Sequence, residues 1–104
     1  MTTLRGKQKR YLRSKAHHLD PLVQIGKNGI TDTVLGQIDE LLERRELIKI
    51  TLLQNTDEVA EDVAELLEKE LQCHVVQKIG RILVVYRPSD KEKYQHISKE
   101  VRSI

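Results

Sequence analysis

The spacing of apolar residues along the chain predicts alternating helices and strands. In three long stretches apolar residues recur every three or four positions, which is the period of a helix with one buried face. Between them lie short runs of alternating or continuous apolar residues, which are typical of strands. The pattern predicts helices over residues 4–18, 32–45, 58–71 and 91–101, and strands over residues 22–25, 47–53, 73–79 and 82–86.

Residues at the ends of these elements support the assignment. Thr3 is expected to cap the first helix, and Asp20-Pro21 to end it, because the residue before a proline is pushed out of the helical region. Gly80-Arg81 is a two-residue turn between the last two strands. Val59 is assigned to the buried face of the third helix, together with other apolar residues at helical spacing.

The order of the elements predicts the topology of the sheet. Each of the two strand-helix-strand connections should be a right-handed crossover, which makes the first three strands parallel and places both crossover helices on one face. Residues 82–86 are apolar on both faces, so this antiparallel fourth strand should lie inside the sheet. The predicted fold class is α/β (α+β): one two-layer domain over residues 1–104, with a four-stranded mixed sheet in the order helix-strand-helix-strand-helix-strand-strand and a short C-terminal helix.

A Gly-x-x-Gly turn, Gly26-Lys27-Asn28-Gly29, is predicted between the first strand and the second helix. Glycine at both ends permits positive φ and lets another backbone come close, while Lys27 and Asn28 occupy the tip. Thr31 can cap the helix that follows, whose free N–H groups would point toward a bound phosphate. In KH domains a loop of this kind holds about four nucleotides of backbone. Two glycines can also make a tight connection for conformational reasons alone.

Charged residues are segregated along the chain, although the net charge is only +2. Residues 1–29 carry seven Lys and Arg against one acid, residues 30–72 carry four against twelve, and residues 73–104 carry seven against three. Between Arg5 and Lys15 there are six cations and no acid. A solvated helix face usually mixes the two signs, so this bias favours a surface that contacts phosphates. The acidic third helix would repel a nucleic acid and should face away from it.

Few residues could support catalysis or bind a metal. Cys73 and His74 are neighbours on a predicted strand, so their side chains should point to opposite faces, and Cys73 is better explained as a small core residue. His17 and His18 are adjacent on a helix and should diverge by about 100°. No cysteine or carboxylate cluster completes a metal site. We therefore expect no catalytic residue, no metal, no cofactor and no small-molecule substrate.

Composition restricts the cellular context and the mode of binding. A single cysteine cannot form an internal disulfide, and no stretch reaches the roughly 20 apolar residues of a membrane span, so we expect a cytoplasmic protein without membrane contact. Tyr11, Tyr86 and Tyr94 are the only Phe, Tyr or Trp residues. This scarcity disfavours domains that stack several bases on aromatic side chains.

Six short segments form a recognisable pattern, in order and without large gaps, over nearly all of the chain up to Pro88. They are Leu12-Arg13, Ala16-His17-His18-Leu19 with Pro21, Gln24-Ile25-Gly26-Lys27-Asn28-Gly29-Ile30-Thr31, Glu46-Leu47-Ile48-Lys49, Gly80-Arg81 and Tyr86-Arg87-Pro88. Together they resemble the CRM domain, named for chloroplast RNA splicing and ribosome maturation. A chain with one such domain is similar to the stand-alone bacterial members, often called YhbY-type.

This resemblance implies RNA binding, a fold similar to the C-terminal domain of bacterial translation initiation factor three, and association with precursors of the large ribosomal subunit. It also implies that the fourth strand lies between the second and the third. The family binds RNA through the Gly-x-x-Gly turn and the basic surface near it. The corresponding RNA-binding candidates are Arg5, Lys7, Lys9, Arg10, Arg13, Lys15, Gly26, Lys27, Asn28, Gly29, Thr31, Arg81 and Arg87, with the last two arginines expected beside the turn.

The predicted function is that of a non-catalytic RNA-binding protein, expected to be a monomer. It would bind ribosomal RNA in precursors of the large ribosomal subunit and assist ribosome assembly, with affinity that falls steeply as salt rises. One alternative is a protein-interaction adaptor whose basic first helix docks an acidic partner. Another is a small nuclease, which the missing acid-base or metal set disfavours.

Overall fold

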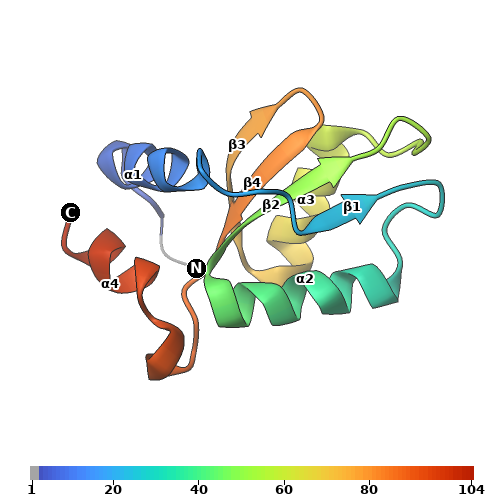
Figure 1. The fold of residues 1–104 in the computed structure, drawn as a ribbon. Coiled ribbons are helices and arrows are strands. Elements are labelled where there is room, and N and C mark those ends of the chain that lie inside the picture. Colours follow the sequence, from blue (N-terminus) through green and yellow to red (C-terminus); the bar gives the residue numbers. More distant parts are fainter. Residues whose placement is uncertain (1–2) are drawn as a thin grey trace.

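A computed structural model describes residues 3–104 of the chain and is drawn in Figure 1. In chain order its elements are α1 (Gly6–Ala16), β1 (Val23–Ile25), α2 (Asp32–Arg45), β2 (Leu47–Leu52), α3 (Ala60–Leu71), β3 (His74–Ile79), β4 (Ile82–Tyr86), the 3-10 helix η1 (Glu92–Tyr94) and α4 (Ile97–Arg102). The first three predicted helices and all four predicted strands are confirmed, most of them with slightly shorter ends.

The strands form one mixed sheet in the order β1-β2-β4-β3. β1 runs parallel to β2, and β4 runs antiparallel to both β2 and β3. β1, β2 and β3 therefore share one direction, as the crossover rule predicts. The central position of β4 confirms the prediction from its continuous apolar sequence, because a central strand packed on both faces needs apolar residues on both. The predicted fold class, a mixed α/β domain with a four-stranded sheet, is confirmed.

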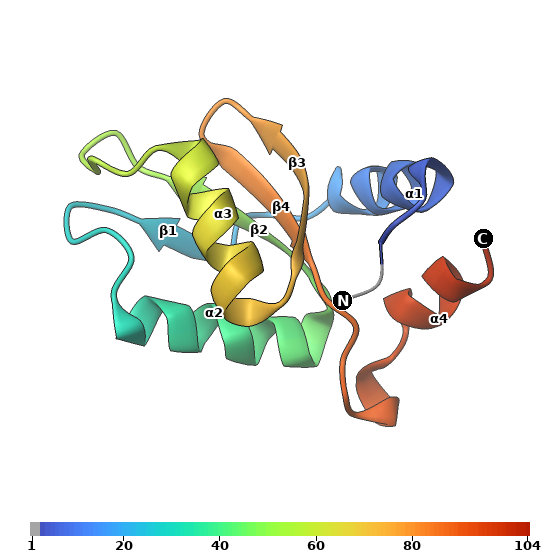
Figure 2. The same ribbon diagram turned by 180° about the vertical axis from the view of Figure 1, so that it is seen from behind.

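Helices α2 and α3 pack on one face of the sheet and enclose the larger part of the core (Figure 2). Ile38 of α2 and Leu67 of α3 are fully buried there against alternate residues of the strands. Thr31 caps α2 as predicted, since its Oγ1 accepts a hydrogen bond from the backbone N–H of Val34 at 3.1 Å. Two amphipathic helices with buried apolar stripes thus cover this face of the sheet.

Helices α1 and α4 pack on the opposite face of the sheet. They add a partial third layer to the two-layer architecture that was predicted. Leu12 and Ala16 of α1 and Val101 of α4 are buried in a second cluster with Leu47 and Tyr86. Leu47 and Tyr86 are paired at the end of the sheet where β2 begins and β4 ends. The two helices therefore cover only that end, and the rest of this face stays uncovered.

The ends of α1 differ from the sequence prediction. The helix begins at Gly6 with Arg5 in the capping position, so the prediction that Thr3 caps it is wrong. It ends at Ala16, before the Asp-Pro pair that was expected to stop it, and His17 forms the C-cap. The backbone leaves the helix early enough to run across the sheet to β1 (Figure 1).

The bounds of two further predicted helices were wrong, although both helices are present. Val59 is extended at the N-cap of α3 (φ −105°, ψ 136°) and is 50% exposed, so it does not belong to the buried face of that helix. The helix predicted over residues 91–101 is split into η1 and α4. Gln95 has φ −82° and ψ 62°, a conformation that cannot continue a helix.

Candidate nucleic-acid interface

The Gly-x-x-Gly segment forms a closed turn directly after β1. The N–H of Gly29 donates to the carbonyl of Gly26 at 3.0 Å, and Lys27 and Asn28 are exposed at the tip. Gly29 has a φ of +66°, which glycine adopts without strain, whereas Gly26 does not have a positive φ. A Cβ at Gly26 would lie 3.4 Å from Asn55 Oδ1. Conformational freedom therefore explains Gly29, and a close neighbouring loop explains Gly26.

Two other loops lie at the same end of the sheet as this turn. Leu53, directly after β2, donates its N–H to the carbonyl of Ile25 at 2.8 Å. Arg81, in the turn between β3 and β4, donates from Nη1 to the carbonyl of Leu53 at 3.1 Å. These bonds place the Arg81 guanidinium at the end of the sheet that also carries Lys27.

A carboxylate also lies beside the turn. A Cβ at Gly29 would come to 2.5 Å from Glu58 Oε1, and Asp57 is exposed next to it in the sequence. Glu58 was predicted to begin the third helix, but it lies in the loop before α3. A phosphate that approaches Lys27 meets this negative charge, which reduces the attraction unless the flexible Glu58 side chain turns away.

The basic residues of the first helix form an exposed surface at the other end of the sheet. All six predicted cations of this helix have exposed side chains. They are Arg5, Lys7, Lys9, Arg10, Arg13 and Lys15. Arg13 is held in place because its Nε donates to the carbonyl of Val76 at 2.9 Å. Figure 1 shows α1 over one end of the sheet and the loop after β1 at the other. The structure therefore does not place the basic helix beside the Gly-x-x-Gly turn.

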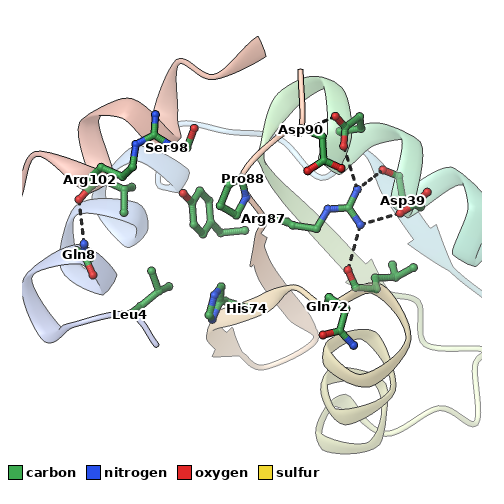
Figure 3. Close-up of a pocket in the computed structure, with 14 residues that line it drawn as sticks. Leu4, Gln8, Asp39, Gln72, His74, Arg87, Pro88, Asp90, Ser98 and Arg102 are labelled. Carbon is green, nitrogen blue, oxygen red and sulfur yellow. Dashed lines mark hydrogen bonds and ion pairs between the residues drawn. The ribbon is translucent and has the colours of Figure 1, made fainter. Parts of the chain in front are cut away.

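Arg87 is also far from the turn, which corrects the expectation that it lies beside it. Its side chain is 16% exposed, and its Nη1 donates to Asp39 Oδ1 at 2.7 Å and to the carbonyl of Leu71 at 3.0 Å (Figure 3). Its Nη2 lies 3.6 Å from Glu43 Oε2. These carboxylates neutralise the guanidinium, so Arg87 ties α2, α3 and the end of β4 together instead of offering a free positive charge.

The cavity beside Arg87 has mixed charge and is poorly suited to a polyanion. It has a volume of about 760 Å³, and its lining includes Asp39, Glu43 and Asp90 (Figure 3). Burial acts to raise the pKa of Glu43, but hydrogen bonds from Ser89 and Asp90 and the charge of Arg87 together hold that pKa below its usual value. Glu43 thus stays ionised, and the cavity keeps its negative charge at neutral pH.

Polar side chains that were not among the predicted site residues lie on the face of the sheet opposite α2 and α3. Gln24 of β1, Lys49 and Thr51 of β2 and Gln77 of β3 are not buried, and those of β1 and β2 alternate with core residues along their strands. The alternation in β2 was the available signal, because it marked Lys49 and Thr51 as one polar face. The acidic helix α3 lies on the opposite face of the sheet from these residues (Figure 2).

Cys73, His17 and His18, which were considered for catalysis or metal binding, lie in different surroundings. Cys73 is fully buried, and burial raises the pKa of its thiol to about 12. The rings of His17 and His18 do not diverge as predicted, because the helix ends before them; their centroids are 5.3 Å apart in an edge-to-face arrangement. Within residues 3–104 no cluster of three His, Cys, Asp or Glu side chains could hold a metal ion.

None of the helices in residues 3–104 has the length and apolar character needed to cross a membrane.

Comparison with known proteins points to one family. The model of the CRS1 / YhbY (CRM) domain matches residues 4–87. The chain is 53% identical over 90 residues to the probable RNA-binding protein YqeI of Bacillus subtilis, covering 86% of this chain and 94% of the relative. It is 43% identical over 95 residues to an RNA-binding protein of Haemophilus influenzae, covering 91% and 96%.

A solved structure has the same fold. The solution structure of a Staphylococcus aureus protein, whose proposed function is RNA binding, superposes with a TM-score of 0.72 at 49% sequence identity. The match covers 86% of this chain and 94% of that protein. The fold of this chain is therefore also found in an experimentally determined relative.

Proposed function

Because the chain belongs to the CRS1 / YhbY (CRM) domain family, we propose that it is a non-catalytic RNA-binding protein of the cytoplasm that assists ribosome assembly. Its RNA would be ribosomal RNA in precursors of the large subunit. The names of the Bacillus and Haemophilus relatives support RNA binding. The choice of ribosomal RNA rests on the resemblance to the stand-alone bacterial members of the family.

The observation that carries this proposal is the geometry of the Gly-x-x-Gly turn. The turn is closed by its own backbone hydrogen bond, and Lys27 and Asn28 are exposed at its tip. Asn55 and Glu58 occupy the space beside the two glycines, so a sugar-phosphate backbone approaches the turn at its exposed tip, where the Glu58 side chain can turn away. Lys27 then neutralises a phosphate, and the N-terminus of α2 adds its positive dipole. Contacts of this kind recognise backbone and shape more than base sequence.

The first test of this proposal uses Lys27→Ala, with Lys69→Ala as its control. Lys69 is an exposed lysine in α3, on the other face of the sheet. Titration with a ribosomal RNA transcript should give weaker binding for Lys27→Ala and unchanged binding for Lys69→Ala. A plot of log affinity against log salt should become shallower by about 0.7 to 0.9 when the Lys27 contact is lost. Wild-type affinity that hardly changes with salt would contradict the proposal.

The ribosomal part of the proposal needs a separate experiment. Tagged protein in a cell extract should sediment on a gradient with immature large subunits. Treatment of the extract with ribonuclease should release it. If the protein runs with mature ribosomes or as free protein, the proposed role in assembly is wrong even if it binds RNA.

The separation of α1 from the turn favours one second candidate, an adaptor whose basic helix docks an acidic protein. Arg5, Lys7, Lys9 and Arg10 could form such a surface without the turn. In that case Lys27→Ala would leave partner binding intact, and ribonuclease would not release the partner.

A further inference from the structure

A groove lies between the C-terminal end of α1 and the uncovered face of the sheet. One wall contains Arg13, His17 and His18, and the opposite side contains Lys49 and Gln77 of the strands. The groove has a volume of about 370 Å³, which is in the lower range of pockets that bind small ligands. We call it the histidine groove. No residue of the Gly-x-x-Gly turn belongs to it.

The histidine groove favours a negatively charged ligand. None of the residues that line it is acidic, and Arg13 and Lys49 are basic. Within residues 3–104 neither of these two cations forms an ion pair with an acid, in contrast to Arg87. The bond from Arg13 Nε to the carbonyl of Val76 fixes the guanidinium in advance, so little conformational freedom is lost when it binds a phosphate.

The imidazole rings and the side-chain amide of the histidine groove suit a nucleobase. Imidazole rings are among the side chains on which unstacked RNA bases stack, and the groove contains the edge-to-face pair of His17 and His18. The side-chain amide of Gln77 can donate and accept hydrogen bonds at a base edge. Ile82 adds apolar surface beside them. A phosphate joined to a base therefore matches the groove better than an acidic peptide does.

A row of side chains joins the groove to the Gly-x-x-Gly turn. Ile82 of β4 pairs with Thr51 of β2, and Thr51 pairs with Gln24 of β1. Paired residues of neighbouring strands point to the same face, so the three side chains lie side by side on the uncovered face. None of them is acidic. Gln24 is followed by one strand residue, and the turn begins directly after it.

We infer that the histidine groove holds one unstacked nucleotide of a single RNA strand, whose backbone continues over Ile82, Thr51 and Gln24 to the turn. The basic helix and the turn then act on the same strand although they lie at opposite ends of the sheet. A duplex does not enter the groove, because its bases stay stacked and its deep major groove is closed to side chains. This inference rests on the proposed function and adds a second contact and the form of the RNA.

The test compares a groove variant with a turn variant on two forms of one RNA. The variants are His18→Ala/Gln77→Ala for the groove, Lys27→Ala for the turn and His96→Ala as a control, since His96 is an exposed histidine outside the groove. The probes are a single-stranded RNA of about ten nucleotides and the same RNA annealed to its complement. Thermal unfolding of each variant shows that it is folded at the temperature used.

The groove variant should bind the single strand about fivefold or more weakly than the wild type and bind the duplex unchanged. His96→Ala should bind like the wild type. A second variant, Lys49→Ala, should make the salt dependence of single-strand binding shallower by about 0.7, because one phosphate contact is lost. The inference is supported if the groove variant and Lys49→Ala both show the expected changes.

Failure of the inference can be told apart from failure of the proposed function. If the wild type binds the single strand, Lys27→Ala weakens binding and both groove variants bind like the wild type, the groove assignment is overturned and the proposed function stands. If the groove variant weakens both RNA forms equally, the assignment of a single strand is overturned. If the wild type binds neither RNA, the proposed function fails and the inference fails with it.

Discussion

The two faces of the sheet differ in how far helices cover them and in the charge that they present. On one face α2 and α3 bury a continuous core, and α3 exposes acids such as Glu61 and Glu65 to solvent. On the other face α1 and α4 cover only one end, which leaves Gln24 and Thr51 uncovered between the basic first helix and the turn that carries Lys27. A polyanion is therefore repelled by the first face and attracted by the second.

The comparison also teaches that a count of cations does not locate a phosphate-binding surface. Arg13 and Arg87 look equally promising in the sequence. Arg87, however, is paired with Asp39 and Glu43, whereas Arg13 bonds to a backbone carbonyl in a groove without acids. The charge of Arg87 contributes to the stability of the fold, and the charge of Arg13 remains available to a ligand.

The largest expected effect is a loss of stability when a core side chain of the covered face is removed. Leu67→Ala removes a fully buried side chain and should lower the free energy of unfolding by roughly 2–5 kcal/mol. Ile79→Ala on the uncovered face, where Ile79 is 58% exposed, should cost less than about 1 kcal/mol. Urea denaturation measures both. Equal losses would mean that the second face is covered as well as the first.

The next prediction concerns the neutralised arginine. Arg87→Ala leaves the carboxylates of Asp39 and Glu43 without their cation and the carbonyl of Leu71 without its donor, so it should cost about 2–3 kcal/mol of stability. Arg44→Ala is the control, because its pair with Glu40 is exposed and should be worth less than about 0.5 kcal/mol. RNA affinity of the folded Arg87→Ala protein should be unchanged. A large loss of RNA affinity would show that Arg87 does belong to the RNA-binding surface.

Two glycines should respond in opposite directions. Gly29→Ala places a side chain at a φ of +66° and should lower stability by roughly 1–2 kcal/mol. Gly36→Ala, at an exposed position inside α2 where a Cβ meets nothing within 4 Å, should raise stability by roughly 0.5–1 kcal/mol. Thermal unfolding of each variant, compared with the wild type, shows whether stability falls or rises. If Gly29→Ala were neutral, the turn would not need the conformation described.

Adding an acid to the uncovered face should weaken RNA binding. Thr51→Glu places a carboxylate between the histidine groove and the turn, and repulsion of about 1 kcal/mol corresponds to roughly a fivefold loss of affinity. Removing a charge from the covered face with Glu61→Gln should change affinity very little. Anisotropy titrations at low salt, where such effects are largest, compare the two variants. Equal effects would show that RNA does not distinguish the faces.

The last prediction concerns pH and a half-buried histidine at the covered end of the sheet. Burial lowers the pKa of His74, with Lys9 acting in the same direction and Glu68 against it. The unfolded chain therefore binds this proton more readily than the folded protein does. Stability should be fully present above the ordinary pKa of about 6.5 and should fall as pH drops from there toward the folded pKa.

Urea unfolding about one pH unit above and one unit below 6.5 measures this effect. His74→Gln removes the titrating group and should show a smaller change between the two pH values than the wild type. An equal change in both proteins would assign the pH dependence to other groups.

The sequence by itself determined the elements of the fold and the position of the turn. Helical spacing located α2 to the residue, and the continuous apolar run of residues 82–86 predicted that β4 is central. Gly26 and Gly29 marked the turn, and Thr31 marked the start of α2. These features follow from periodicity and from the backbone preferences of neighbouring residues, which are local and can be read along the chain.

Only the tertiary structure decided which charges meet. Arg87 forms an ion pair with Asp39, which is 48 positions away in the sequence. Glu58 lies against Gly29 although the two belong to different loops. The histidine groove exists because α1 ends at Ala16 and packs on one end of the sheet, which leaves His17 and His18 facing uncovered strands. Contacts between distant segments depend on layer packing and strand order, and no local pattern of residues encodes them.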